Sequence, residues 1–227
     1  MIIHDIVIRM KHHIRKFYEK SFHRNALESY IRTYAKDVKG KVLDIGSKNR
    51  RYDHLFINAK EIIAIDVMEN KENDVIYADA RNLFFKDFSF NSVICFEVLE
   101  YIIETEIVLN EVSRVLKSDG NFVFSVPFIN PIHGFAKIND NNTDSIRLTS
   151  KAWHEILTKR FSKVKIISFG NKNSLLYSII FSIVRRKKII RALIYPFMKI
   201  LHLYLLKNIQ NKIDYHYPLG YFIICNK

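Results

Sequence analysis

The chain has 227 residues, two cysteines and a formal net charge of +13 at pH 7. This length suits one α/β domain with an added segment, and two cysteines within apolar runs exclude a disulfide-based secreted scaffold. Residues 156–213 contain no acidic residue but hold 13 of the 36 Lys and Arg residues. The excess charge therefore belongs to one segment, which argues against a basic field over the whole protein.

The N-terminal part is predicted to be helical and basic. Residues 1–24 carry apolar side chains at helical spacing among basic ones, and residues 25–38 continue this spacing before a turn at Gly40. We treat residues 1–39 as an N-terminal basic helical segment. Its histidines form no ligand set, so no metal site is predicted. The opening "MIIHDIVIRMKHH" is too short for a span and lacks a cleavage site, so we expect a cytoplasmic chain.

Seven apolar runs predict strands, namely "KVLDIG", "EIIAIDV", "DVIYADA", "NSVICFE", "NFVFSVPF", "SKVKIISFG" and "PLGYFIICNK". Between the fourth and fifth, "YIIETEIVLNEVSRVLKSDG" has one helical stripe that ends at Gly120. A further helix, "TSKAWHEILTKRF", can be capped by Thr149 or Ser150. Continuous apolar strands alternating with helices predict an α/β fold with a doubly wound, Rossmann-like, mostly parallel sheet.

Acidic residues and one glycine follow the strands, where an open parallel sheet binds its ligands. They are Asp44, Gly46, Asp66, Asp79 and Glu97. Asp and Gly also end strands for turn reasons alone. Acidic residues at four successive strand ends nevertheless favour a binding site. Asp66, about 20 residues past the first loop, is well placed to accept ribose hydroxyls.

The runs "VLDIG", "IIAIDV", "DVIYADARNLFFKDFSFNSVICFEVLEYI", "NEVSRVLKSDGNFVFSVPF" and "GYFIICNK" resemble the successive motifs of class I S-adenosylmethionine-dependent methyltransferases. The stretch "SVPFINPIHG", with the D-x-x-R-x-T pattern at Asp144, Arg147 and Thr149, further resembles a branch found in bacterial gene clusters for surface polysaccharides. The resemblance implies a seven-stranded sheet with an antiparallel last strand. Residues 40–227 would form the methyltransferase domain, including a helical insert at about 172–213.

The resemblance also implies roles for individual residues. S-adenosyl-L-methionine would be held by Asp44, Gly46, Ser47, Asp66, Val67, Asp79, Ala80 and Glu97. In this assignment Asp66 binds the ribose, Asp79 with the Ala80 backbone recognises the adenine, and Gly46 allows close approach of the methionine moiety. Asp44 orients the first loop or accepts from the amino group.

The remaining candidates concern the acceptor. His133 is the candidate catalytic base, and its alternative is a loop histidine that bonds its own backbone. Tyr101, Asp144 and Arg147 are the candidate substrate residues, although Asp144 and Arg147 are equally interpretable as an ion pair that pins the loop. Tyr101 stands where the family often carries histidine.

The first loop departs from the family pattern. Only Gly46 of the usual alternating glycines is present, and Lys48 and Arg50 occupy positions where glycine is frequent. We expect either a differently shaped loop or side chains that point away from the cofactor. Lys48 or Arg50 could instead pair with the carboxylate of the cofactor or with an anionic acceptor. We interpret the loop as altered but working.

The insert contains an apolar run at 175–184, "RRKK" at 185–188 and a second apolar stretch at 189–206 in which Arg191, Lys199 and His202 form one polar stripe. Pro196 predicts a kink or a boundary. One interpretation is a lid over the substrate with the polar stripe in water; another is attachment of residues 175–207 to an anionic membrane face. The segment is too apolar for a nucleic-acid surface.

The function predicted from these features is S-adenosylmethionine-dependent methyl transfer to a small-molecule or glycan acceptor. The favoured acceptor atom is a sugar hydroxyl or carboxylate oxygen in surface polysaccharide biosynthesis, and a lipid-linked glycan would suit a lid that touches a membrane. The enzyme would then be peripheral at the inner face of the cell membrane. The alternatives are a non-catalytic binding protein with this fold and, less favoured, an RNA methyltransferase.

Overall fold

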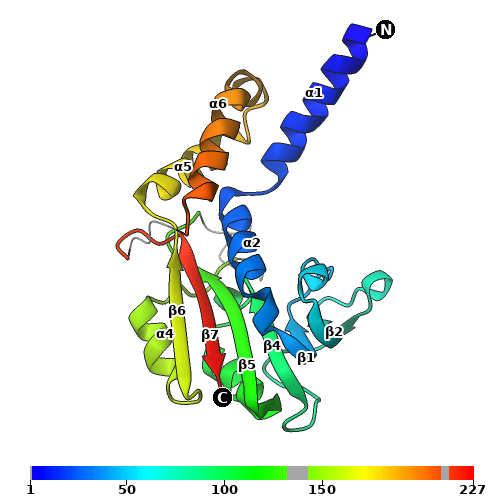
Figure 1. Cartoon of the computed structure of the whole chain (residues 1–227), viewed down its shortest axis with the longest axis vertical. Helices are drawn as coiled ribbons and strands as arrows, with labels where there is room; N and C mark the ends of the chain where they lie inside the picture. Colours follow the sequence, from blue (N-terminus) through cyan, green and yellow to red (C-terminus); the bar gives the residue numbers. More distant parts are fainter. Residues whose placement is uncertain (1, 132–142, 211–214) are drawn as a thin grey trace. The chain divides into compact units, whose positions relative to one another are not determined.

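The computed structural model describes residues 2–131, 143–210 and 215–227 (Figure 1). Seven strands form one sheet in the order β3-β2-β1-β4-β5-β7-β6. The strands are β1 (Lys39–Ile45), β2 (Asn58–Asp66), β3 (Val75–Tyr77), β4 (Phe90–Phe96), β5 (Leu116–Pro127), β6 (Lys163–Phe169) and β7 (Gly220–Asn226). Strands β1 to β5 pair in parallel, whereas β7 pairs antiparallel with β5. The predicted fold class, with its antiparallel last strand, is confirmed.

Six α-helices are seen in the described part of the chain. They are α1 (Ile2–Glu19), α2 (Phe22–Tyr34), α3 (Thr105–Val115), α4 (Ser150–Leu157), α5 (Lys172–Val184) and α6 (Lys188–Lys207). Helix α4 begins as predicted, because the Thr149 side chain accepts from the Ala152 amide at 3.3 Å. Pro196 lies inside the single helix α6.

Helix α3 is shorter than its hydrophobic stripe predicted. The expected end at Gly120 is wrong, since the helix ends at Val115 and Leu116 already has extended backbone angles (φ −71°, ψ 139°). Leu116 pairs with Phe90 across the β4–β5 ladder. Pairing in the sheet has therefore overridden the helical spacing of the residues that follow.

The chain divides into two compact units, and helix α2 contributes to both. The sheet unit comprises Tyr30–Phe128, Ile132–Ser168 and Gly220–Lys227. The helical unit comprises Met1–Ser29, Ile129–Pro131 and Phe169–Leu219. The basic N-terminal helix and the acid-free insert, far apart in sequence, thus belong to the same unit. Each unit is described separately below.

The central strands of the sheet unit are buried on both faces. In β4 the consecutive residues Val93, Ile94 and Cys95 are fully buried, as expected for a sheet covered on each side. Aromatic pairs extend this core, with Phe124 against Trp153 at 5.4 Å between ring centroids. Cys95 and Cys225 are both free and buried. The apolar runs of the sequence therefore form the interior of the sheet.

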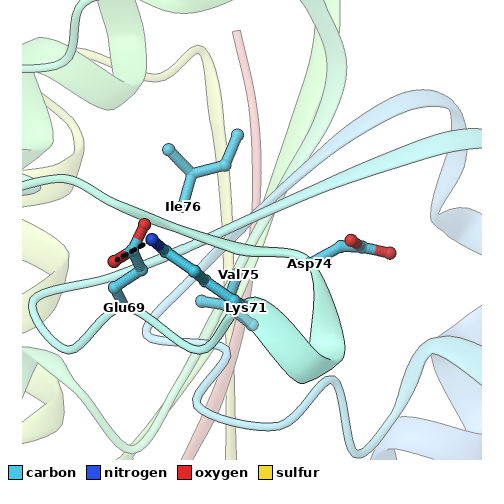
Figure 2. A pocket seen from close by; sticks show the side chains of 5 residues that line it. All are labelled: Glu69, Lys71, Asp74, Val75 and Ile76. Carbon is cyan, nitrogen blue, oxygen red and sulfur yellow. Dashed lines mark ion pairs between the residues drawn. The ribbon is translucent and has the colours of Figure 1, made fainter.

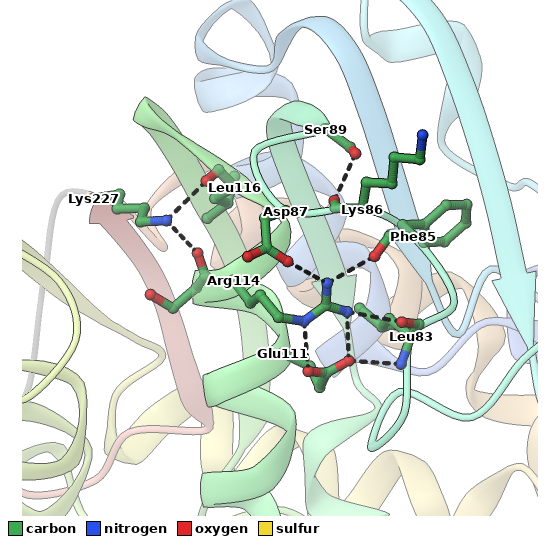
Figure 3. Close-up of polar contacts among 10 residues, drawn as sticks. Leu83, Phe85, Lys86, Asp87, Ser89, Glu111, Arg114, Leu116 and Lys227 are labelled. Atoms are coloured by element: carbon green, nitrogen blue, oxygen red, sulfur yellow. Dashed lines mark hydrogen bonds and ion pairs between the residues drawn. The ribbon is translucent and has the colours of Figure 1, made fainter.

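A charged cluster around Arg114 ties α3 to the segment that leads into β4 (Figure 3). The Arg114 guanidinium pairs with Glu111 and Asp87, each at 2.8 Å, and donates to the carbonyls of Leu83 and Phe85 at 2.8 and 2.7 Å. Glu111 in turn accepts from the Leu83 amide at 2.7 Å. Because the guanidinium donors reach several fixed acceptors, this cluster holds the approach to β4 in place.

Candidate active site

The first loop after β1 is pressed against the end of β2. The amides of Gly46 and Ser47 both donate to the Ile65 carbonyl, at 2.8 and 3.1 Å. Gly46 has a φ of 74°, and a Cβ added there would lie 2.2 Å from Cγ2 of Val98. Both the backbone angle and the space therefore require glycine at this position.

Lys48 and Arg50 adopt the left-handed backbone that glycine would supply, with φ of 54° and 51°. The loop thus keeps a left-handed residue at every second position from Gly46, at a cost of about 1 kcal/mol for each non-glycine residue. The Arg50 side chain pairs with Asp53 at 2.7 Å and donates to the Ile62 carbonyl at 3.2 Å. Arg50 is therefore used to hold its own loop, whereas the Lys48 side chain is exposed.

Asp66 at the end of β2 closes this loop. Its carboxylate accepts from the amides of Lys48 and Met68, both at 3.0 Å. Its carbonyl accepts from the Ala78 amide at 3.0 Å, which aligns the end of β3 beside it. Each carboxylate oxygen has two acceptor sites, so Asp66 keeps capacity to bind hydroxyl groups. The neighbouring Val67 is 63% exposed.

Asp79 after β3 is engaged by an arginine that sequence reasoning missed. The Arg81 guanidinium lies 2.7 Å from the Asp79 carboxylate, and the Arg81 amide donates to it at 2.9 Å. The hydrogen bond from Arg81 lowers the pKa of Asp79, so this carboxylate is ionised near neutrality. The signal was the sequence "DAR", in which Arg81 follows two residues after Asp79. Ala80 between them is buried.

Asp44 is a buried carboxyl at the end of β1, with 7% of its surface exposed. Burial raises its pKa to about 7, against the opposing effect of the Ser47 hydroxyl. Within the described residues Asp44 has no salt-bridge partner. A carboxyl balanced between its neutral and ionised forms is suited to accept a hydrogen bond from an ammonium group, which would favour the ionised form.

Two acidic residues follow β4. Glu97 has a φ of 58°, and its carboxylate accepts from the Ser125 hydroxyl at 2.9 Å. Glu100 is 1% exposed, and in the described part of the chain neither of its side-chain oxygens has a hydrogen-bond partner. Burial, with Glu97 nearby, raises the pKa of Glu100 well above its usual range. Sequence reasoning missed Glu100, although "FEVLE" places a second acid in the same loop.

The segment after β5 is attached to this loop. The amides of Ser145 and Ile146 donate to the Glu100 carbonyl at 2.6 and 3.1 Å. The Arg147 guanidinium pairs with the Asp144 carboxylate, whose side chain is 2% exposed, and donates to the Phe128 carbonyl. These contacts favour the pinning role for Asp144 and Arg147.

The structure thus brings most of the predicted residues to one edge of the sheet. Asp44, Gly46, Ser47, Asp66, Val67, Asp79, Ala80, Glu97 and Tyr101 lie at or just beyond the carboxyl ends of the parallel strands or in the loops that follow them. Tyr101 is half-buried, beside Glu100. His133 lies outside the described residues, so its role as a base stays a prediction.

A hollow on the edge of the sheet lies beside β3 (Figure 2). It is lined by Glu69, Lys71, Asp74, Val75 and Ile76, with Lys71 3.7 Å from Glu69. None of the predicted site residues lines it. The charged side chains around it are already paired or exposed, and we assign it no part in the site.

Part of the chain matches a known protein family. Residues 23–124 match the family model for a methyltransferase domain. The chain is 30% identical over 174 residues to the uncharacterized protein MJ1252 of Methanocaldococcus jannaschii, and the match covers 70% of this chain and 69% of that protein.

Solved structures agree on the fold. A SAM-dependent methyltransferase from Thermotoga maritima has a TM-score of 0.58 at 16% identity, covering 91% of each chain. A SAM-dependent methyltransferase from Archaeoglobus fulgidus has a TM-score of 0.53 at 19% identity, covering 88% of this chain and 91% of that one. At these identities the likeness shows the fold alone.

Proposed function

We propose that the chain, which carries a methyltransferase domain match at residues 23–124, transfers a methyl group from S-adenosylmethionine to an oxygen of a small-molecule or glycan acceptor. The acceptor oxygen we favour is a sugar hydroxyl or carboxylate in surface polysaccharide biosynthesis. The observation that carries the proposal is the first loop, in which Gly46, Lys48 and Arg50 all have positive φ and Asp66 closes the turn. Backbone strain of this kind is concentrated at functional sites.

The residues at the strand ends fit this cofactor. Asp66 retains acceptor sites for the ribose hydroxyls, and the Ala80 backbone next to Asp79 would recognise the adenine edge. Asp44, with its raised pKa and no salt-bridge partner within the described residues, suits the ammonium group of the methionine moiety. When bound, S-adenosylmethionine supplies a methyl group on a positively charged sulfur.

Methyl transfer itself requires little covalent chemistry from the protein. The acceptor oxygen forms its bond to the methyl carbon as the sulfur–carbon bond breaks, and the electron pair of that bond stays on sulfur. The residues of the chain therefore mainly position the acceptor and exclude water. A hydroxyl acceptor must also lose its proton, for which we propose His133, whereas a carboxylate acceptor needs no base.

Titration calorimetry with S-adenosylmethionine and S-adenosylhomocysteine tests the first part of the proposal. We expect both to bind and to raise the melting temperature, with adenosine alone as the weaker control. Absence of binding at millimolar concentration would favour a non-catalytic binding protein. Steeply salt-dependent binding of RNA would instead favour an RNA methyltransferase.

The acceptor is tested with methyl-labelled cofactor and a panel of sugar nucleotides, uronic acids and lipid-linked sugars. We expect label on a sugar oxygen, and mild base separates the two acceptor atoms because it hydrolyses a methyl ester but not a methyl ether. With a hydroxyl acceptor, His133→Ala should lower turnover far more than the affinity for S-adenosylhomocysteine. Unchanged turnover in that variant would remove His133 as the base.

A further inference from the structure

Helix α5 in the helical unit is inverted relative to an ordinary amphipathic helix. Its buried side contains two serines, Ser174 and Ser178, together with Tyr177 and Phe181. Its opposite side exposes large aliphatic side chains, namely Leu176, Ile179, Ile180 and Ile183, at 42–59% of their surface. Residues of these two sets differ by about half a turn around the helix. The more polar face of α5 is thus turned inward.

Helix α6 has the same arrangement. Its buried residues are Met198, His202 and Leu205. The outward side chains are 58–77% exposed and include Ile189, Leu193, Phe197, Ile200, Leu203 and Tyr204. The sequence-based interpretation that the polar stripe of this helix faces water is wrong for His202, because that side chain is only 3% exposed. The wide apolar side of the helix faces outward instead.

Buried hydrogen bonds fix this orientation. Nδ1 of His202 lies 3.0 Å from the Tyr177 hydroxyl of α5, and Nε2 lies 3.0 Å from the Asn25 side-chain amide of α2. The Tyr177 hydroxyl also donates to the Met198 carbonyl at 3.0 Å. Phe181 packs beside this group, with its ring 5.8 Å from that of His202. Rotating either helix would leave these polar groups buried without partners.

These contacts bear on how α6 could meet a membrane. Lys188–Lys207 is long and apolar enough to cross a bilayer, and 17% of its most apolar window is buried in the protein. A spanning helix would have to carry the His202 hydrogen bonds to Tyr177 and Asn25 into the lipid, or break them. The inward side is therefore committed to protein, and only the outward side is available. This geometry suits a helix that lies on a surface.

The charge of the insert favours an anionic surface. Four exposed basic residues lie in the turn between the two helices and at the start of α6, namely Arg185, Arg186, Lys187 and Lys188, and no acidic residue occurs from 156 to 213. A symmetric pairing of this face with a second copy of the chain would bring one all-basic segment against another. An anionic lipid surface satisfies both the apolar side chains and the basic turn.

We propose that helices α5 and α6, which are labelled in Figure 1, dock through their exposed apolar sides on an anionic lipid surface. The aliphatic and aromatic side chains enter the interface between headgroups and acyl chains, and the basic turn contacts the headgroups. This surface goes beyond methyl transfer and does not depend on it, so the two can be tested separately.

Vesicle flotation of the full chain tests this surface. We expect binding to vesicles of phosphatidylcholine mixed with phosphatidylglycerol, little binding to phosphatidylcholine alone, and release by high salt. Arg185→Ser with Arg186→Ser should weaken binding roughly 30-fold, because each basic residue near an anionic surface contributes about 1 kcal/mol to binding. The matched control, Lys60→Ser with Lys86→Ser, removes the same charge from exposed positions of the sheet unit and should leave binding unchanged.

The apolar contribution is tested with Leu193→Ser and Phe197→Ser together, which should weaken binding about tenfold or more. Ile103→Ser, at a residue that is 71% exposed in the sheet unit, is the control. All of these positions are exposed, so we expect unchanged melting temperatures. Equal binding of both vesicle types, no binding, or a stable dimer that Leu193→Ser and Phe197→Ser dissolve would overturn the proposal, the last in favour of a second copy.

Discussion

The central strands of the sheet unit and the helices α5 and α6 of the helical unit differ in how much of their apolar surface is exposed. In the sheet unit, Val93, Ile94 and Cys95 are buried while acidic side chains lie at the strand ends. In the helical unit, Ser178 and His202 are buried while aliphatic side chains of α5 and α6 are exposed. The hydrophobic effect produces the first arrangement in water. The second is costly in water, and the proposed lipid surface would cover these side chains.

This contrast separates two kinds of evidence for function. The candidate site in the sheet unit is defined by the hydrogen bonds and backbone angles of the loops that follow the strands. The surface in the helical unit is defined by which side of each helix is committed to the protein. Changes confined to one unit should therefore leave the property of the other intact.

The largest effect is expected from Gly46→Ala. The added Cβ would lie 2.2 Å from Cγ2 of Val98, at a φ of 74°, so contact and backbone strain act together. We expect the free energy of unfolding to fall by up to about 5 kcal/mol and affinity for S-adenosylhomocysteine by about 100-fold or more. Denaturant titration and calorimetry measure the two effects.

The control adds Val98→Ala to Gly46→Ala, which relieves the contact but not the backbone strain, and should restore part of the loss. Where Gly46→Ala still folds, vesicle binding should match that of the unaltered chain. Loss of vesicle binding in a folded variant would show that the two units are not independent.

Asp44→Asn should produce the next largest effect. Burial raises the pKa of Asp44 from 3.8 to about 7, so the folded chain keeps a proton that the unfolded chain releases between these values. The free energy of unfolding therefore falls as the pH rises from about 4 to about 7, by up to about 4 kcal/mol. Asp44→Asn removes this pH dependence, which denaturant titration across that range measures.

The affinity for the cofactor should depend on pH through the same carboxyl, but in the opposite direction to the free energy of unfolding. An ammonium group favours the ionised form of Asp44, so affinity for S-adenosylhomocysteine should rise as the pH passes upward through the pKa of Asp44. Asp44→Asn should bind about tenfold more weakly above that pKa and should lack this part of the dependence. Identical pH profiles for both proteins would separate Asp44 from the ligand.

His202→Gln tests the inverted packing of the helical unit. Burial lowers the pKa of His202 to about 4, so the unfolded chain binds a proton that the folded chain excludes. The free energy of unfolding should therefore fall by about 3 kcal/mol as the pH falls from about 6.5 to about 4. The glutamine variant should lack this contribution. Denaturant titration of both proteins across this pH range measures it as the difference between their free energies of unfolding. No difference would mean that His202 is accessible to water.

The smallest effects are expected in the first loop. Lys48→Gly removes the backbone strain of a left-handed residue whose side chain is exposed. Glycine also gives the unfolded chain more conformational freedom, which offsets part of this gain. The free energy of unfolding should therefore rise by about 0.5 kcal/mol. Arg50→Gly should lower it by about 1 kcal/mol, because hydrogen bonds to Asp53 and Ile62 are lost. If Lys48→Gly also weakens binding of S-adenosylhomocysteine, the lysine charge assists the cofactor.

Much of the sheet unit could be predicted from sequence. Short runs of consecutive apolar residues that alternate with helices predict a sheet covered on both faces, and the acidic residues that follow these runs predict the edge where a ligand would bind. Other contacts could not be predicted. The bond from Arg50 to the Ile62 carbonyl depends on strand pairing, and the end of α3 depends on the pairing of Leu116 with Phe90.

The orientation of α5 and α6 shows a general limit of predicting helix packing from sequence. Helical spacing indicates which residues share a face, but not which face meets the protein. A polar stripe like that of α6 would ordinarily be placed in water. The inward position of His202 in this stripe follows from Asn25 and Tyr177, whose hydrogen bonds to His202 join parts of the chain that are distant in sequence.

The connection between β6 and β7 has an evolutionary consequence. These strands are neighbours in the sheet, and the chain leaves β6 and returns to β7 at one point, where the Leu219 amide donates to the Phe169 carbonyl at 2.8 Å. The long segment between them joins two neighbouring strands that a short turn could connect. Such a segment could be lengthened or replaced without changing the order of any strand in the sheet.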